Sequence, residues 1–161
     1  MRTLSVHMIA ALGSLGLAGF SASASSELSG QENAGAEIDQ VLGDWTFSTK
    51  TYRNGTCSMS GSLFVFDNNA AQSSAQCQLT AVEVCGQERS IVEQTCTLEL
   101  NEGGAVVSSE IVQFLERKPS SVGYLPDNFD LYSLTSDKMT GELDSAVSSE
   151  VEFRRREGSI S

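Results

Sequence analysis

The sequence predicts an all-β fold, an eight-stranded antiparallel up-and-down β-barrel with a short N-terminal helical turn. Segments in which apolar and polar residues alternate recur from residue 44 to residue 155, and turn-forming residues separate them. No stretch of about 10–15 residues with helical spacing lies between them, which argues against a parallel α/β fold. Eight strands with mostly short connections are enough to close a barrel, and closure removes exposed sheet edges.

Each predicted strand is a run of alternating residues that ends at a turn. The Asn54-Gly55 pair after the first run is a strong hairpin signal. Ile38, Val41 and Leu42 have helical spacing and predict the single helical turn before the barrel. In chain order, the predicted strands cover residues 44–49, 57–65, 77–85, 92–98, 106–114, 129–134, 138–143 and 146–155.

The N-terminal residues 1–24 are predicted to be a secretory signal peptide. Arg2 gives a positive start, residues 8–20 form an apolar run, and residues 22–24 are a small-x-small cleavage site. The apolar run is shorter than the roughly 20 residues that a transmembrane helix needs, so we expect no membrane span. The mature chain is therefore expected to be extracytoplasmic, either periplasmic or secreted.

The remaining chain is predicted to hold one domain behind a flexible lead-in. Residues 25–40 form this lead-in, since most of them are Ser, Gly, Glu and Ala with few large apolar groups. Residues 41–157 form the barrel domain, which has a normal size for one domain. The chain has 21 acidic and 10 basic residues and a formal net charge of −11. This charge argues against nucleic acid and anionic membrane surfaces as partners.

The histidine-based groups that many catalytic sites need are absent from the predicted mature chain, so a carboxylate pair or a lysine is what remains for catalysis. The one histidine of the sequence, His7, lies in the predicted signal peptide, which leaves no histidine base, nucleophile partner or metal ligand. The sequence has no Cys-x-x-Cys pair and no glycine-rich phosphate loop between a strand and a helix. We therefore expect a protein that is not an enzyme, with no catalytic residue, cofactor or metal ligand.

Four cysteines in a secreted domain of this size predict two disulfides, with three possible connectivities. A turn over residues 68–74 places Cys57 opposite Cys85, and a turn centred on residues 86–87 places Cys77 opposite Cys96. Both pairs then face inward on adjacent antiparallel strands, where the Cα separation suits a disulfide. Sequential pairing would need larger register shifts and stays open as the alternative.

The two ends of the barrel sequence are predicted to meet and seal one end of the barrel. Gly43 and Trp45 begin the first strand, and the last strand carries three consecutive arginines. If Val151 and Phe153 point inward, Arg155 does so too, and its guanidinium can lie across the indole face. An immunoglobulin-like sandwich is the main competing fold, but its tryptophan lies between two cysteines, whereas Trp45 precedes all four.

With these residues the chain resembles the calycin-type barrels, which include lipocalins, avidins and bacterial periplasmic metalloprotease inhibitors. In such barrels a Gly-x-Trp on the first strand packs near an Arg or Lys of the last strand, and Gly43, Trp45 and Arg155 match this pattern. The resemblance covers most of residues 41–156 in layout. The four cysteines depart from the single disulfide typical of the inhibitor group, so neither ligand nor partner is carried over from the resemblance.

The loop before the sixth predicted strand is the candidate contact site for a ligand or partner. It sets aromatic and apolar residues beside a Pro-Asp-Asn turn, and aromatic residues near a barrel mouth often contact ligands. The alternative is a turn whose aromatic side chains cover the core. The candidate contact residues are Tyr124, Pro126, Asp127, Asn128 and Phe129.

Glu83 is the one acidic residue that the alternation places on an inward face, between Ala81 and Cys85. A buried carboxylate would have a raised pKa and could form a site. We favour the alternative, in which Glu83 lies near a barrel mouth in water or pairs with Arg155 or Arg89.

Small residues on the inward faces have two interpretations. Gly61, Gly141, Ala81 and Ser133 would leave space for a ligand inside the barrel. The glycines can equally mark bends that allow the barrel to close. The answer depends on whether the interior is hollow or is filled by large side chains, of which the candidates are Met59, Leu63, Leu79, Ile111 and Leu143.

The first functional hypothesis is a secreted or periplasmic, non-enzymatic binding protein of calycin-like barrel type that holds a small apolar ligand or a protein partner. The alternative is a proteinaceous inhibitor of an extracytoplasmic protease or hydrolase, with residues 25–36 entering the enzyme cleft. A small hydrolase that uses Asp or Glu would need clustered inward carboxylates, and the sequence reveals no such cluster.

Overall fold

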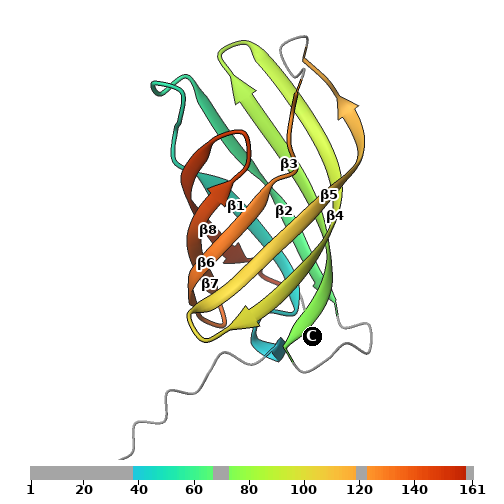
Figure 1. Cartoon of the computed structure of the whole chain (residues 1–161), viewed down its shortest axis with the longest axis vertical. Helices are drawn as coiled ribbons and strands as arrows, with labels where there is room; N and C mark the ends of the chain where they lie inside the picture. Colours follow the sequence, from blue (N-terminus) through green and yellow to red (C-terminus); the bar gives the residue numbers. More distant parts are fainter. Residues whose placement is uncertain (1–37, 67–72, 119–122, 159–161) are drawn as a thin grey trace, which may run out of the picture. The chain divides into compact units, whose positions relative to one another are not determined.

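The computed structural model describes residues 38–66, 73–118 and 123–158, and every structural statement below refers to them. Eight strands in these residues close into one antiparallel barrel, in which β8 returns to pair with β1 (Figure 1). The predicted fold class is therefore confirmed, including the helical turn, which is the 3-10 turn η1. The elements are η1 Ile38–Gln40, β1 Gly43–Thr49, β2 Cys57–Phe66, β3 Ser74–Cys85, β4 Glu88–Asn101, β5 Gly104–Glu116, β6 Asn128–Leu134, β7 Lys138–Asp144 and β8 Ser148–Arg155.

Some of the predicted segments lie outside the described residues, among them the predicted signal peptide and residues 25–37 of the predicted lead-in. The same holds for residues 68–72 of the predicted turn between the second and third strands. Among the described residues, no helix has the length and apolar character to span a membrane.

Large apolar side chains from alternate strand positions pack inside the barrel. The rings of Phe47, Phe129 and Phe153 form the centre of this core, with centroid separations between 5.1 and 5.4 Å. Full burial of each such side chain contributes about 1.5–3 kcal/mol. Four of the five residues expected from the sequence to fill the interior are also buried, namely Met59, Leu63, Leu79 and Leu143.

Two bulges redirect the second half of β5. Register shifts against β4 leave Val112 and Leu115 outside the regular pairing, and both side chains are exposed, at 59% and 55%. β5 pairs with β6 only through Ala105–Val107. Ile111, the fifth candidate core residue, therefore lies beyond the cover of β6 and is only half-buried. Bulges at such an edge hinder pairing with other chains.

A bulge in β6 makes the expectation for Ser133 wrong. Leu131 pairs with Gly141 and Ser133 pairs with Thr140, so Tyr132 is the extra residue. An inserted residue reverses the inward and outward alternation beyond it, which turns Ser133 to the exposed face.

Gly61 and Gly141 allow neighbouring strands to approach closely and leave no room for a ligand. A Cβ atom at Gly61 would lie 1.9 Å from the carbonyl oxygen of Thr80 and 2.7 Å from the ring of Phe47. At Gly141 it would lie 2.1 Å from the carbonyl oxygen of Asp130. Of the two interpretations of these glycines, the structure supports barrel closure.

The two ends of the chain's barrel region meet as the sequence predicts. Arg155 lies opposite Trp45 in the β1–β8 register, and its Cζ atom is 4.2 Å from the centroid of the indole ring. The guanidinium also donates to the carbonyl oxygens of Leu42 and Gln40, at 2.6 and 2.5 Å. Gly43 has a φ of +109°, and a Cβ there would lie 3.0 Å from Arg155 Nη1. These contacts cover one end of the barrel.

Replacement of Arg155 by methionine is expected to lower the free energy of unfolding by about 2 kcal/mol, because it removes a cation–π contact and charge-assisted hydrogen bonds. Urea unfolding monitored by circular dichroism measures this change. Arg154→Met is the matched control, since Arg154 is exposed and should leave the unfolding midpoint unchanged. Equal unfolding midpoints for the two variants would show that Arg155 does not stabilise the barrel.

Candidate functional site

The end of the barrel opposite to Trp45 contains buried polar side chains. Consecutive strands are antiparallel, so the end of β3 and the starts of β4, β6 and β8 meet there. Polar groups away from water cost free energy unless they have partners, which makes this cluster unusual in an otherwise apolar interior. Its buried members are Tyr52, Glu83, Ser90, Gln94, Ser109, Lys118 and Asp127.

Glu83 is paired on both carboxylate oxygens. The hydroxyl of Tyr52 donates to Oε1 at 2.9 Å, and the ammonium of Lys118 forms an ion pair with Oε2. The side chains of Glu83 and Lys118 are only 6% and 3% exposed. The expectation that Glu83 lies in water or pairs with an arginine is therefore wrong. Arg89 pairs instead with Glu116, at 2.5 Å.

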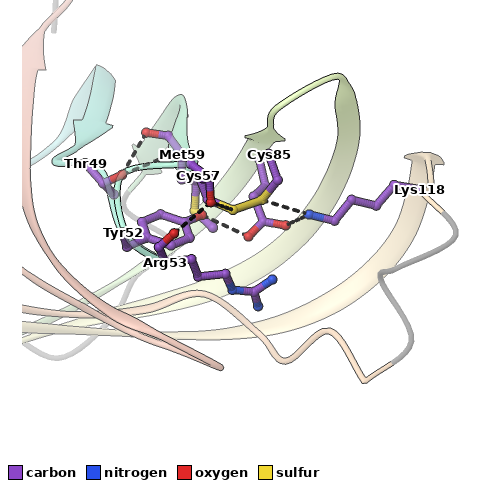
Figure 2. Close-up of a disulfide and its surroundings, with 9 residues drawn as sticks. Thr49, Tyr52, Arg53, Cys57, Met59, Cys85 and Lys118 are labelled. Carbon is purple, nitrogen blue, oxygen red and sulfur yellow. Dashed lines mark hydrogen bonds and ion pairs between the residues drawn. A yellow bond between two sulfur atoms is a disulfide. The ribbon is translucent and has the colours of Figure 1, made fainter.

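Both predicted disulfides are present, one between β2 and β3 and the other between β3 and β4. Cys57 is bonded to Cys85 and Cys77 to Cys96, with Cα separations of 4.1 and 4.8 Å. Each bridge contributes on the order of 3 kcal/mol by restricting the unfolded chain. Figure 2 shows Lys118 reaching toward the first bridge, where its Nζ lies 3.2 Å from Cys85 Sγ.

Cys57, Glu83 and Cys85 bring their ligand atoms within 4.8 Å of one another. A metal would need both sulfurs as thiolates. The disulfide engages both of them, and Lys118 neutralises Glu83. We therefore infer that these three residues stabilise the polar cluster and do not bind a metal.

Asp127 is the second buried carboxylate of the cluster and has no exposed surface. Its Oδ2 accepts hydrogen bonds from Gln94 Nε2 and from the hydroxyl of Tyr124, both at 2.6 Å. The backbone N–H of Asp127 donates to Gln94 Oε1 at 3.0 Å, and its carbonyl accepts from Ser109 Oγ at 2.8 Å. Among the described residues, Oδ1 has no hydrogen-bond partner.

Burial raises the pKa of Asp127 to about 6, from an ordinary value of 3.8. The hydrogen bonds from Tyr124 and Gln94 favour the ionised form and act in the opposite direction, as does the nearby Ser145. The negative charge of Glu83 raises the pKa slightly further. Burial also raises the pKa of Tyr52 and Tyr124, so both hydroxyls remain protonated donors at neutral pH.

A cavity of about 50 Å³ lies over this cluster. A buried water occupies roughly 10–15 Å³ on this measure, so the cavity has room for a few waters or for the end of a small ligand. A site for a whole drug-sized ligand needs about 300–1,000 Å³. The polar residues that line the cavity are Arg53, Glu83, Lys118, Tyr124, Asp127 and Ser145.

The five candidate contact residues of the predicted loop lie in different places, and only two of them line the cavity. Tyr124 and Asp127 line the cavity, and the ring of Tyr124 packs edge-on against Phe114 at 5.6 Å. Phe129 is a fully buried core residue. Asn128 begins β6, and its Oδ1 accepts from the backbone N–H of Ser109 at 2.8 Å. Pro126 does not line the cavity.

Most members of the site were missed in the sequence-based predictions, and three of them show why. Tyr52 lies in the turn after β1, and Lys118 follows the bulged half of β5, where alternation no longer tells which side chains point inward. Alternation along residues 92–98 puts Gln94 on the same face as Cys96, but no sequence pattern links it to Asp127, 33 residues away. The available sequence signal for a buried polar cluster is that alternation puts two polar side chains, Glu83 and Gln94, on the inward faces of paired strands.

Because Asp127 is protonated more easily in the folded protein, its contribution to stability falls as pH rises from 3.8 to about 6. In that interval the folded state holds a proton that the unfolded chain has released. We expect the unfolding free energy of the wild type, relative to Asp127→Asn, to fall by about 2 kcal/mol between these limits. Urea unfolding of both proteins at a series of pH values measures it. If the unfolding free energies of the wild type and Asp127→Asn differed by the same amount at every pH, the raised pKa of Asp127 would be contradicted. Asp130→Asn, on the exposed face, is the control and should follow the wild type at each pH.

Comparisons with known proteins establish the fold and no family. No protein-family model matches the chain, and no curated protein matches its sequence. Solved structures that resemble it include a de novo designed fluorescence-activating β-barrel, with a TM-score of 0.51 and 14% identity over 74% of this chain and 96% of that one. A redesigned β-barrel bound to DFHBI has a TM-score of 0.51 and 9% identity, over 74% and 97% of the two chains. The resemblance to calycin-type barrels stays a prediction.

Proposed function

We propose that the chain is a non-enzymatic, extracytoplasmic binding protein that holds part of a small ligand, or a side chain of a protein partner, at the polar end of its barrel. The observation that carries this proposal is the buried polar cluster with its cavity, set above a core of packed apolar side chains. Apolar residues in the same positions would generally give an equal or more stable fold. A binding role accounts for the polar groups at this end.

The ligand group that this site favours is polar, in contrast to the small apolar ligand expected from the sequence. The cavity is lined by charged and hydroxyl-bearing side chains and is too small for a whole apolar ligand. The designed barrel bound to DFHBI supports the idea that such a fold can hold a small molecule. Two disulfide pairs agree with an oxidising, extracytoplasmic environment.

A binding role also fits the two carboxylates better than hydrolysis. The structure does bring Glu83 and Asp127 to the same end of the barrel, a clustering that the sequence did not reveal. Glu83, however, has one oxygen engaged by Lys118 and the other by Tyr52, so both oxygens are held by neighbouring side chains of the cluster. We therefore propose no catalytic residue.

NMR titration with three small probes, propylamine, 1-propanol and propionate, tests this proposal. We expect at least one probe to give saturable amide shifts at Tyr52, Glu83, Tyr124 and Asp127. Ala146→Trp, at the cavity rim, should abolish them, whereas Ser62→Trp, on the outer face of β2, should not. Shifts confined to the Trp45 end or to the outer face, or no saturable shift with any probe, would overturn the proposal.

The alternative role, inhibition of an extracytoplasmic protease or hydrolase, depends on residues 25–36, which lie outside the described residues. A deletion of these residues separates the two roles. A binding protein whose ligand lies at the polar end keeps the probe-induced shifts after the deletion. Loss of inhibition of a partner enzyme by a deletion variant with unchanged stability would favour the inhibitor.

A further inference from the structure

We propose that the polar end of the barrel recognises a primary ammonium group, which donates a hydrogen bond to Oδ1 of Asp127. This inference rests on the proposed function and names the ligand chemistry of the same site. The ammonium belongs either to a small free amine or to the lysine side chain of a partner protein. Both sources present the same group to the cavity.

The hydrogen bonds of Asp127 leave one acceptor for a ligand. Oδ2 already accepts from Tyr124 and Gln94, whereas the fully buried Oδ1 accepts from no described residue. A carboxylate is an acceptor only, so a group that completes its hydrogen bonding must be a donor. Asp127 is one of the residues that line the cavity, the space that a ligand group would fill.

The charges around the cavity favour a cationic donor. Three charged groups besides Asp127 line it, namely Glu83, Lys118 and Arg53. Glu83 and Lys118 neutralise each other, and Tyr52 and Tyr124 are neutral donors that already point at carboxylates. Arg53 is exposed at the rim, and no ion pair of the described residues involves Asp127. Asp127 is thus the buried charge that lacks an opposite charge in contact.

The cavity volume and lining select a primary amine on a short alkyl chain. About 50 Å³ accommodates an ammonium and one or two methylene groups, but not a quaternary amine with bulky substituents. Met59 and Val147 supply an apolar wall for the alkyl part. The net charge of −11 also attracts cations to the protein surface.

Isothermal titration calorimetry of the full protein, with both disulfides formed, tests the inference with propylamine as the probe at pH 7.5. We expect saturable binding that weakens at least ten-fold in Asp127→Asn, which keeps the shape of the side chain but removes its charge. Asp130→Asn is the matched control on the exposed face of β6 and should bind as the wild type does. Equal propylamine binding by the wild type and Asp127→Asn would overturn the inference.

A second measurement keeps the inference testable if Asp127→Asn is poorly folded. Propylamine binding to the wild type should weaken as pH falls through about 6, because protonation of Asp127 removes the charge that the ammonium contacts. Affinity that is constant between pH 7.5 and 5 would contradict the inference. Nα-acetyl-lysine amide serves as a second probe, and its binding with the same dependence on Asp127 identifies a lysine as an acceptable source.

The outcomes separate this inference from the proposed function. If 1-propanol or propionate shifts the amides at the polar end and propylamine does not, the ammonium inference is wrong and the binding site stands. If no probe shifts those amides, both are wrong. Propylamine binding that maps to another surface overturns the inference as well.

Discussion

Replacement of Lys118 by methionine is expected to lower the free energy of unfolding by about 3–5 kcal/mol. Methionine keeps most of the side-chain volume but removes the ammonium that neutralises Glu83 in a site where both side chains are at most 6% exposed. An unpaired buried carboxylate either stays charged at high cost or takes up a proton. Urea unfolding at pH 7 measures this loss.

Two further variants show whether the loss comes from the charge. The double variant Glu83→Gln with Lys118→Met should recover most of the lost stability, because it removes both charges together. Arg89→Met breaks an exposed pair with Glu116 and should leave the unfolding midpoint unchanged. A Lys118→Met protein as stable as the wild type would show that the buried ion pair is not formed.

Gly141→Ala is expected to lower the free energy of unfolding by about 3 kcal/mol and to reduce the soluble yield. The added methyl group would meet the Asp130 carbonyl oxygen at 2.1 Å and the Cα atom of Leu131 at 2.8 Å. These are backbone atoms of the adjacent strand, so relief requires β6 and β7 to separate. The gain of roughly 0.5–1 kcal/mol that alanine normally gives in a strand is much smaller than this cost.

Gly103→Ala is the matched control for this clash. Gly103 lies in the turn between β4 and β5, and a Cβ there would meet its nearest described atom, Asn101 Oδ1, at an ordinary 3.5 Å. Thermal unfolding should show a large fall in the midpoint for Gly141→Ala and little change for Gly103→Ala. Similar midpoints for the two variants would mean that Gly141 is not required for the close approach of the strands.

The sequence predicts the barrel well because its determinants are local and periodic. Alternation along each strand sets the inward face, and short turns fix which residues lie opposite each other. Cys57 is opposite Cys85 and Cys77 is opposite Cys96, as the turn positions imply. Parity along the last strand selects Arg155 as the residue over Trp45. Each of these predictions needs only the period of a strand and one turn.

The site is less predictable because it depends on departures from that period. The bulges at Val112 and Leu115 break the alternation of β5 just before Lys118, so its approach to Glu83 cannot be derived from parity. Asp127 precedes β6, in a segment without strand periodicity. Its contact with Gln94 joins residues 33 positions apart and depends on the closed barrel. The sequence therefore identifies the loop but not its buried partners.

In the proposed complex, Asp127 at the polar end of the barrel accepts a hydrogen bond from the donor group of a ligand. Carbon-13 NMR of the Asp127 carboxyl group, in a pH titration with and without saturating propylamine, tests it most directly. We predict a pKa near 6 for the free protein and a lower pKa with the amine bound, because the ammonium stabilises the ionised form. An Asp127 carboxyl signal that titrates identically with and without propylamine would contradict this proposal.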